Sequence, residues 1–376
     1  MKTSEKLSAL RKCIEFIQDH KKDFKLREEA LIIEGDEEVF SISEDRIFKI
    51  PEVSDSRKLG FVDGGTEPLI KGSDFSISIS RIAGVIFDSQ KMIAPEKLPT
   101  IVEFYSATIC EKEESGELIF RTSFFPKDDN YKSYLPKADI EIPLKDPSIK
   151  MQGRFLMPIE NHGGIAMRFA EWTYANHFIK SELNNGDIFL RDGSLQTGYS
   201  NEIDLANAVY TEGINKNVYI TGLSKSCRLL NESGSSLNSQ IFIIGNSKFP
   251  KDSWYYYPIK KITRVDNQAD LFFVRLNKDS PYSFRFDIYI KQSKDLSKEE
   301  REVIISNIAN NSRDPSLLGY PYGLIKVDQL ARISKKEIES YKIQLLIEFD
   351  KDVFNKFISP RLRSIDAHDI LNKIRK

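Results

Sequence analysis

Three acidic residues stand where their carboxylates could act together on one metal ion. Asp63 follows an apolar stretch in FVDGG, Glu171 lies within MRFAEWTYANHF, and Asp192 follows a second apolar stretch in IFLRDGS. Mg²⁺ and Mn²⁺ prefer carboxylate oxygen, and two such ions about 4 Å apart can activate water and stabilise the leaving oxygen of a phosphodiester. We therefore predict that these residues form a divalent-metal site for phosphodiester hydrolysis.

Each aspartate is placed after an apolar segment and before glycine. The carboxyl ends of strands are where open α/β sheets bind their ligands. If Asp63 ends such a strand, Gly64 and Gly65 leave room for a phosphate backbone beside it. Asp-Gly is also a favoured turn sequence, so a plain turn remains the alternative at Asp63 and at Asp192.

The glutamate lies on a predicted helix that is apolar on most sides. Met167, Glu171, Tyr174 and Phe178 recur at helical spacing, which predicts a buried helix. An ionised carboxylate in a core costs several kcal/mol unless a cation or hydrogen-bond donors compensate it. A metal would compensate Glu171. The alternatives are an ion pair with Arg168 or another arginine, or a position at a solvent edge.

The elements that must position these residues form a mixed pattern. Between residues 58 and 222, antiparallel hairpins come first, and helices and strands then alternate, which predicts a mixed sheet with helices packed on it. We expect an α/β fold of the ribonuclease H-like kind. The strands are expected at 58–65, 74–87, 100–109, 117–125, 187–195 and 217–225, and the helices at 163–183 and 201–216.

The rest of the chain supplies extra helical elements at both ends. Residues 1–57 are expected to form a helical and charged extension, and residues 58–376 a nuclease domain with its ribonuclease H-like core at about 58–225. Accessory strands and helices are expected over 226–376. They comprise a strand-rich stretch at 254–290 and helices near 296–311, 324–333, 335–349 and 361–376. In the N-terminal extension a helix is expected at 3–23, and residues 126–162 are expected to be irregular.

Composition narrows the class of protein. The 376 residues include 55 Lys plus Arg and 56 Asp plus Glu, a net charge of -1 that argues against a protein coating long duplex DNA. Four histidines make a metal site built from imidazole improbable. Three cysteines without a CxxC pair are typical of a reducing compartment, so we expect a cytoplasmic protein. Neither a signal peptide nor a membrane span is expected.

The blocks FVDGGTE, EWTYA, NNGDIFLRDGSL, GLSKS, GYPYGLIKVDQLARI and DAHDIL, in that order, resemble the NurA nuclease family. The resemblance runs loosely from about residue 58 to 371. It implies a ribonuclease H-like enzyme that degrades DNA ends with Mn²⁺ or Mg²⁺. It also implies a homodimer docked to a hexameric ATPase called HerA. No GxxxxGK[ST] loop is present, so the motor would be the partner.

The resemblance assigns residues as well. Asp63, Glu171 and Asp192 match the family's metal-binding carboxylates, and Tyr320 matches a late catalytic tyrosine that could instead be a buried core residue. Lys225 is a candidate phosphate ligand or a solvated lysine. The family commonly has a histidine eight residues after the tyrosine, where this chain has Asp328. Aspartate still binds Mg²⁺ or Mn²⁺, but it is no proton donor near neutral pH.

A second candidate for nucleic-acid binding is the stretch DSWYYYPIKKITR at 252–264. Its aromatic residues beside Lys260, Lys261 and Arg264 would suit base stacking and phosphate contacts of single-stranded DNA. A tyrosine-rich strand is equally typical of a core or a subunit interface.

Three functions are consistent with these features. The first is a metal-dependent DNA exonuclease and endonuclease working with a HerA-type ATPase in end resection or anti-phage defence. The second is a catalytically weak structural adaptor of such a complex, which the change to Asp328 favours. The third is a ribonuclease or an Argonaute-like guide-binding protein, because no motif here separates DNA from RNA.

Overall fold

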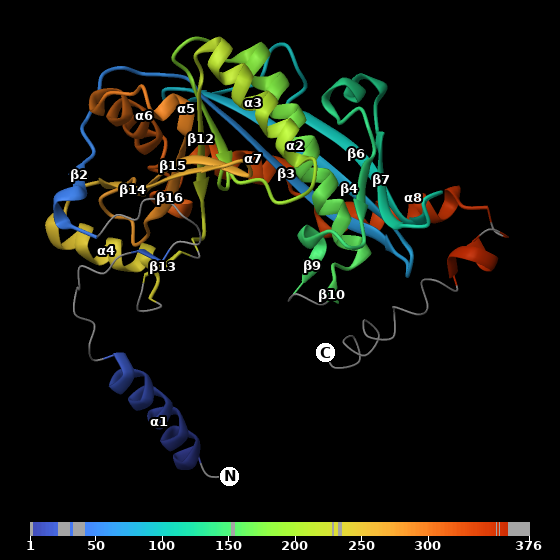
Figure 1. Cartoon of the computed structure of the whole chain (residues 1–376), viewed down its shortest axis with the longest axis horizontal. Coiled ribbons are helices and arrows are strands. Elements are labelled where there is room, and N and C mark those ends of the chain that lie inside the picture. The colour runs from blue at the N-terminus through green and yellow to red at the C-terminus, as the bar shows by residue number, and fades with distance from the viewer. Residues whose placement is uncertain are drawn as a thin grey trace.

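The computed structural model of the chain describes residues 3–21, 31–32, 42–151, 155–227, 229–231, 235–350, 352 and 354–359. Within this part, twelve strands form one mixed sheet (Figure 1) with the order β2-β14-β15-β16-β12-β11-β3-β4-β6-β7-β8, and β5 pairs with β4. The strands are β2 (Ile47–Lys49), β3 (Leu59–Lys71), β4 (Phe75–Asp88), β5 (Lys91–Ile93), β6 (Ile101–Lys112), β7 (Leu118–Pro126), β8 (Ile140–Pro143), β11 (Ile188–Asp192), β12 (Tyr219–Ser224), β14 (Trp254–Arg264), β15 (Asn267–Arg275) and β16 (Phe284–Tyr289).

The helices are α1 (Thr3–Lys21), α2 (His162–Glu182), α3 (Glu202–Lys216), α4 (Leu237–Lys248), α5 (Ile290–Ser293), α6 (Lys298–Asn310), α7 (Tyr322–Ala331) and α8 (Lys335–Glu348). Two small strand pairs lie outside the main sheet: β1 (Leu31–Ile32) with β13 (Leu230–Asn231), and β9 (Lys150–Met151) with β10 (Phe155–Leu156).

The centre of the sheet has the predicted ribonuclease H-like arrangement. β3, β4 and β6 are successive antiparallel neighbours. β3 then pairs in parallel with β11, and β11 in parallel with β12. Helix α2 precedes β11 and α3 connects β11 to β12, as parallel neighbours require a crossover. The predicted fold class, a mixed sheet flanked by helices, is confirmed.

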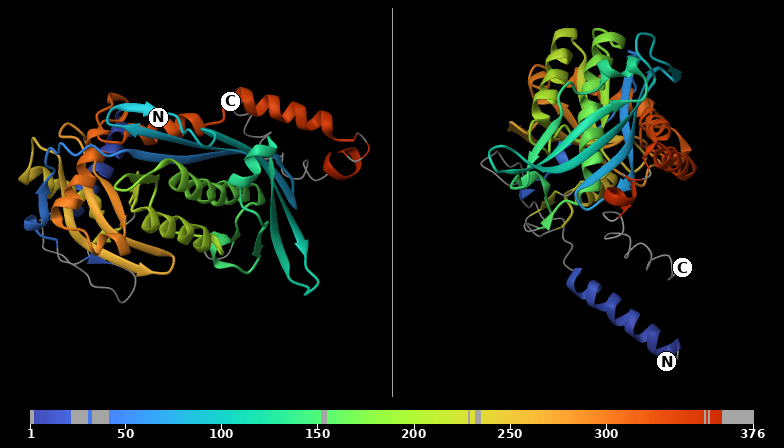
Figure 2. Two further views of the ribbon diagram at one scale, coloured as in Figure 1. Left: turned by 90° about the horizontal axis from the view of Figure 1, so that it is seen from above. Right: turned by 90° about the vertical axis from the view of Figure 1, so that its right-hand side faces the viewer.

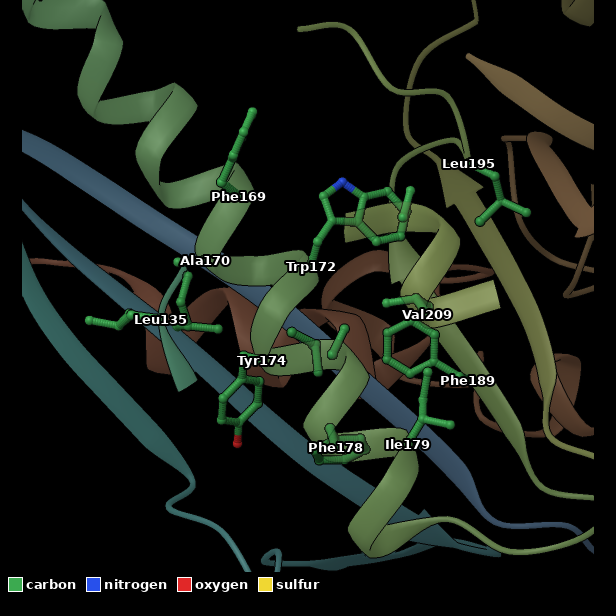
Figure 3. Close-up of a cluster of buried hydrophobic side chains, with 14 of the residues drawn as sticks. Leu135, Phe169, Ala170, Trp172, Tyr174, Phe178, Ile179, Phe189, Leu195 and Val209 are labelled. Atoms are coloured by element: carbon green, nitrogen blue, oxygen red, sulfur yellow. The ribbon is translucent and has the colours of Figure 1, made fainter. Parts of the chain in front are cut away.

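Helices cover both faces of the sheet. Figure 2 shows α2 and α3 on one face and α7 and α8 on the other. Successive residues of a strand point to opposite faces. Accordingly Val62 belongs to the core under α2 and α3, whereas Phe61 belongs to the core under α6 and α7. Residues of α2 such as Trp172, Tyr174 and Phe178 fill the first of these cores (Figure 3).

The first strand is longer than predicted. The expected strand at 58–65 ended at the two glycines, but β3 continues through them and pairs with β4 from Leu59 to Lys71. The Asp-Gly-Gly step is therefore no turn. Strand pairing with β4 overrides the local turn preference of glycine, so the turn alternative at Asp63 is wrong.

The other predicted elements match the observed ones closely. The helices expected at 163–183 and 201–216 are α2 and α3, and the strand expected at 74–87 is β4. The region expected to be irregular, 126–162, contains the short strands β8, β9 and β10 and several 3-10 turns.

The two ends of the chain differ in how they relate to the sheet. Helix α1 stands apart from the rest of the molecule (Figure 1), with Leu10 and Ile17 exposed, whereas β2 pairs with β14 at one edge of the sheet. The division into 1–57 and 58–376 stays a prediction. The helix expected at 361–376 lies outside the described residues. Among the described helices, none is both long and apolar enough to cross a membrane.

Candidate active site

The three predicted carboxylates come from three different elements and line one cavity of about 450 Å³. Asp63 lies within β3, Glu171 lies in the middle of α2, and Asp192 is the last residue of β11. The complete lining consists of Asp63, Met157, Asn161, Gly164, Met167, Arg168, Glu171, Arg191, Asp192 and Tyr199. Residues separated by more than a hundred positions in the chain are thus brought to one place.

Asp63 carries the strongest electrostatic evidence for a cation site. Burial, followed by the negative charges of Glu171 and Asp192, raises the pKa of Asp63 from 3.8 to about 8. The Gly64 N–H donates to Asp63 Oδ1 at 2.8 Å and Lys225 lies near, but these two favourable contacts do not offset the increase. Asp63 is therefore held in its protonated form up to about pH 8, chiefly by burial and also by the two neighbouring carboxylates.

Glu171 is almost fully buried and faces an arginine. Its side chain is 7% exposed, and Arg191 Nε lies 3.6 Å from Glu171 Oε1. Burial raises the pKa of Glu171, while Arg191 and Arg168 oppose that shift. The Arg191 guanidinium is fixed over the Trp172 ring at 4.2 Å and donates from Nη1 to the Ser194 carbonyl at 2.8 Å. The predicted alternative, an arginine partner for Glu171, is thus also present.

Asp192 has a partner on each of its oxygens. The Tyr320 hydroxyl donates to Oδ1 at 2.9 Å, and Lys225 Nζ lies 2.7 Å from Oδ2. Tyr320 is 1% exposed, and burial together with Asp192 raises its pKa far above its usual range. Tyr320 therefore remains a hydrogen-bond donor at any working pH. It positions Asp192 and cannot serve as a base.

Asp328 lies on the outer side of this group. Its carboxylate lies 4.0 Å from Lys225 Nζ and 2.9 Å from Nη2 of Arg332, the residue that follows the end of α7. Asp328 does not line the cavity that the other three carboxylates share. Lys225 lies between Asp192 and Asp328 and contacts both. Asp328, the predicted fourth metal ligand, is thus separated from Asp192 by a lysine.

The glycines beside Asp63 accommodate protein. A Cβ on Gly64 would lie 2.3 Å from Met167 Sδ, and a Cβ on Gly65 would lie 2.4 Å from the carbonyl oxygen of Ala331. Side chains at these positions would thus collide with α2 on one face and with α7 on the other. The expectation that these glycines leave room for a phosphate backbone is wrong.

Sequence reasoning missed the residues that hold the site in shape. Arg191 was not singled out, although an arginine in an otherwise apolar strand needs a buried partner. Asp287 is fully buried, forms a bidentate ion pair with Arg285, and accepts from the Leu195 N–H at 3.1 Å. It thereby fixes the loop that follows Asp192. No local pattern marks this role because Asp287 comes from β16.

No described side chain of the second predicted nucleic-acid contact, 252–264, lines this cavity. Arg264 is exposed at the end of β14 and forms an ion pair with Asp266 at 3.0 Å. The backbone of Lys260 and Lys261 pairs with β15, while their side chains lie outside the described part. Trp254, Tyr255 and Tyr256 are buried, as the core alternative predicted.

The residues fit a hard divalent cation by their chemistry. The donors are carboxylate oxygens, the ligands that Mg²⁺ and Mn²⁺ prefer, and burial with the two neighbouring carboxylates raises the pKa of Asp63. Within the described part of the chain, however, no three His, Cys, Asp or Glu side chains are already arranged to hold an ion. Lys225 Nζ contacts Asp192 Oδ2, so this oxygen would reach an ion only after the lysine has moved away.

Comparisons with known proteins give only remote likenesses. No family model matches the chain, and no curated protein matches it. Ciona intestinalis Endonuclease V in complex with an inosine-containing DNA is 12% identical, with a TM-score of 0.35 over 79% of this chain and 93% of that chain. Aquifex aeolicus Argonaute is 11% identical (TM-score 0.30, 81% of this chain and 30% of that one), and Drosophila Piwi is 9% identical (TM-score 0.26, 74% and 30%).

At these identities and TM-scores the likenesses carry no argument about function. The chain spans about 30% of the length of these Argonaute and Piwi chains. The fold assignment accordingly stands on the strand order and the crossover connections described above.

Proposed function

We propose that this chain is a divalent-metal-dependent nuclease that hydrolyses phosphodiester bonds. One observation carries the proposal: Asp63, Glu171 and Asp192 line a single cavity, and burial with the two other carboxylates raises the pKa of Asp63 to about 8. Ionising Asp63 at this buried position, beside two other carboxylates, has a free-energy cost that no contact within the site removes. A cation that arrives with the substrate would relieve this cost.

Bound Mg²⁺ or Mn²⁺ would supply Lewis-acid stabilisation and an activated water. The chain's own residues prepare the site. The Tyr320 hydroxyl donates to one oxygen of Asp192, and Arg191 forms an ion pair with Glu171. Lys225, which is 48% exposed, exchanges Asp192 for a non-bridging oxygen of the phosphate. That exchange frees a carboxylate oxygen and places a positive charge on the substrate.

The finer identity follows from the resemblance to NurA. We propose DNA as the substrate, cleavage from ends and internally, a homodimer, and a HerA-type hexameric ATPase as the partner. End resection and anti-phage defence are the two settings that such a pair would serve. Co-purification with a hexameric ATPase tests the partnership, and parallel assays on DNA and RNA of the same sequence test the substrate.

The catalytic proposal is tested with matched amide variants. Wild-type protein, Asp63→Asn and Glu171→Gln are incubated with end-labelled linear DNA and Mn²⁺ or Mg²⁺, and Asp279→Asn, on the exposed surface, serves as the control. We expect both site variants to lose at least a hundredfold in rate and the control to match wild type. Cleavage that survives Asp63→Asn rejects this site.

A structural adaptor is the second candidate, and one observation favours it. Both oxygens of Asp192 are already engaged, and cationic side chains lie beside Asp192 and Glu171 where a metal would compete. Asp328 likewise faces Lys225 and Arg332. The adaptor predicts DNA binding without cleavage in either metal, even when the ATPase partner is present.

A further inference from the structure

The cavity continues past the carboxylates along the first turns of α2. Asn161, Gly164, Arg168 and Glu171 all line it, at positions i, i+3, i+7 and i+10. Residues at this spacing share one face of a helix. From Glu171 to Gly164 this face runs roughly 10 Å, at 1.5 Å for each residue. We call this helix face, formed by Asn161, Gly164, Arg168 and Glu171, the track; it begins at the proposed metal ligand Glu171 and leads away from it.

Arg168 is held rigidly on this track. Its Nε donates to Glu202 and its Nη2 donates to the Gln196 carbonyl. Glu202 is itself fully buried and accepts from Trp172 Nε1 at 2.7 Å and from the Gly198 N–H at 2.7 Å. A planar guanidinium anchored through two of its nitrogens is preorganised for a further bidentate contact.

The anchored guanidinium still has a free edge. Its side chain is 29% exposed, and among the described residues no acceptor is paired with its Nη1. Tyr199, whose N–H also donates to Glu202, lines the cavity beside it. The remaining donors of Arg168 are therefore available to a ligand in the cavity.

The first turn of α2 leaves space next to this donor. A Cβ on Gly164 would meet nothing within 4 Å, whereas a Cβ on the neighbouring Gly163 would lie 2.3 Å from Ser78 Oγ. Asn161 is exposed and makes no side-chain capping bond with the helix. Gly163 is thus explained by packing against β4. Gly164 faces open cavity, and no contact within the protein accounts for it.

We propose that this track is a subsite for a backbone phosphate of the substrate strand, held by Arg168 in the space left by Gly164. The proposal deepens the nuclease function and rests on it. Arg168 lies three residues, or about 4.5 Å of helix axis, from Glu171. Because Arg168 is about one helical turn from Glu171, we expect the bound phosphate to be a near neighbour of the scissile one, one or two nucleotides along the strand. Arginine suits this role because its fork matches phosphate oxygens.

Gly164 offers a test that leaves the fold intact. Gly164→Glu and Gly164→Gln place side chains of the same size into open space, and only the first carries charge. Binding of a fluorescent 20-nucleotide single strand and of the matching duplex is measured by anisotropy with Ca²⁺, with wild type as the reference. We expect Gly164→Glu to weaken binding at least tenfold and to bind at least fivefold more weakly than Gly164→Gln. Equal affinities of the two variants overturn the phosphate assignment.

Arg168 is tested through the salt dependence of binding and through the substrate. Arg168→Gln should reduce the slope of log K against log salt by about one, and Arg168→Lys should retain it. Arg313, which is exposed and is not among the residues that line the cavity, provides Arg313→Gln as the matched control, with an unchanged slope. An unchanged slope in a folded Arg168→Gln overturns the proposal.

Neutral methylphosphonates placed singly along the strand locate the contact without any change to the protein. A methylphosphonate at one position, one or two nucleotides from the cleavage point, should weaken the binding of wild-type protein. The same modification should not weaken the binding of Arg168→Gln, which already lacks this contact. The same response at every position overturns the subsite. Binding and cleavage are measured separately. If the protein binds the strand through this track but never cleaves it, only the nuclease proposal is rejected. If Gly164→Glu cleaves as fast as wild type, only the subsite is rejected.

Discussion

At the scale of single residues, the raised pKa of Asp63 lowers the free energy of unfolding of the metal-free protein near neutral pH. In the unfolded chain its carboxyl ionises above its usual pKa of 3.8, whereas in the folded protein it stays protonated up to about 8. The unfolded state thus releases a proton that the folded state retains, and the stability of the metal-free protein falls as pH rises from 4 to 8.

Asp63→Asn should therefore stabilise the metal-free protein. Asparagine has a similar shape and cannot ionise, so the gain should be small at pH 4.5 and reach on the order of a few kcal/mol at pH 8. Thermal unfolding in EDTA at pH 4.5, 6 and 8 measures it, with Asp279→Asn as the control. A gain that does not depend on pH would contradict the assigned direction of the pKa shift.

Tyr320 is predicted to position Asp192 without taking part in proton transfer. Tyr320→Phe removes one hydrogen bond to the carboxylate, which costs about 1 kcal/mol of stability, while Lys225 stays on the other oxygen. We expect a three- to tenfold loss of cleavage rate and an unchanged pH profile. Asp192→Asn should lose far more. Equal losses in the two variants would show that Tyr320 contacts the substrate itself.

At the scale of elements, the glycines of β3 set the distance between layers. Gly65 lies against the carbonyl oxygen of Ala331 at the end of α7, and backbone cannot rotate away as a side chain can. We expect Gly65→Ala to cost about 1–3 kcal/mol by overpacking. Urea unfolding measures it. Gly164→Ala is the matched control, because its Cβ enters open space and should be neutral or slightly stabilising.

Helix α8 is attached to the sheet by a small cluster of apolar residues and by charge. Ile338, Tyr341 and Leu345 pack on Leu69, Ile79 and Ile333. Arg81 on β4 forms ion pairs with Glu103 at 2.6 Å and with Glu337 at 2.8 Å. The hydrogen bond from Arg81 and the contacts to Ser334 lower the pKa of Glu337 from 4.5 to about 2.

This contact predicts acid sensitivity of one helix. Because the pKa of Glu337 is lower in the folded state, its contribution is complete above pH 4.5 and disappears as pH falls toward 2. Hydrogen exchange of α8 should therefore accelerate between pH 5 and 3 relative to α2. Glu337→Gln should exchange faster already at pH 5 and respond less to acid, while Glu339→Gln should behave as wild type.

Local sequence patterns were sufficient for most elements, and the three carboxylates they singled out line one cavity, although their role as metal ligands stays a prediction. Alternation of apolar and polar residues predicts β4, and helical spacing predicts α2, because both patterns record burial on one face. The extension of β3 through Gly64 and Gly65 could not be predicted, since it depends on pairing with β4. The same limit hid Arg191 and Asp287, whose partners lie on other elements.

At the scale of the whole molecule, the site lies where separate cores meet on one sheet. Phe61 and Val62, just before Asp63, belong to the two cores on opposite faces. Glu171 comes from the helix layer on one face, and Tyr320 comes from the core on the other. An ion held by residues from β3, α2 and β11 would therefore add a link between elements that strand pairing and the core under α2 already hold together.

Metal binding should consequently stabilise the fold as a unit. A ligand that binds only the folded state adds RT ln(1 + [L]/Kd), about 2.7 kcal/mol at a hundredfold excess over Kd. We expect Mn²⁺ to raise the melting temperature of wild-type protein by a few degrees, more at pH 8 than at pH 5, because Asp63 must lose its proton to bind. Asp63→Asn should start higher and gain little. An equal rise in both proteins would place the ion elsewhere and remove the physical basis of the proposed nuclease site.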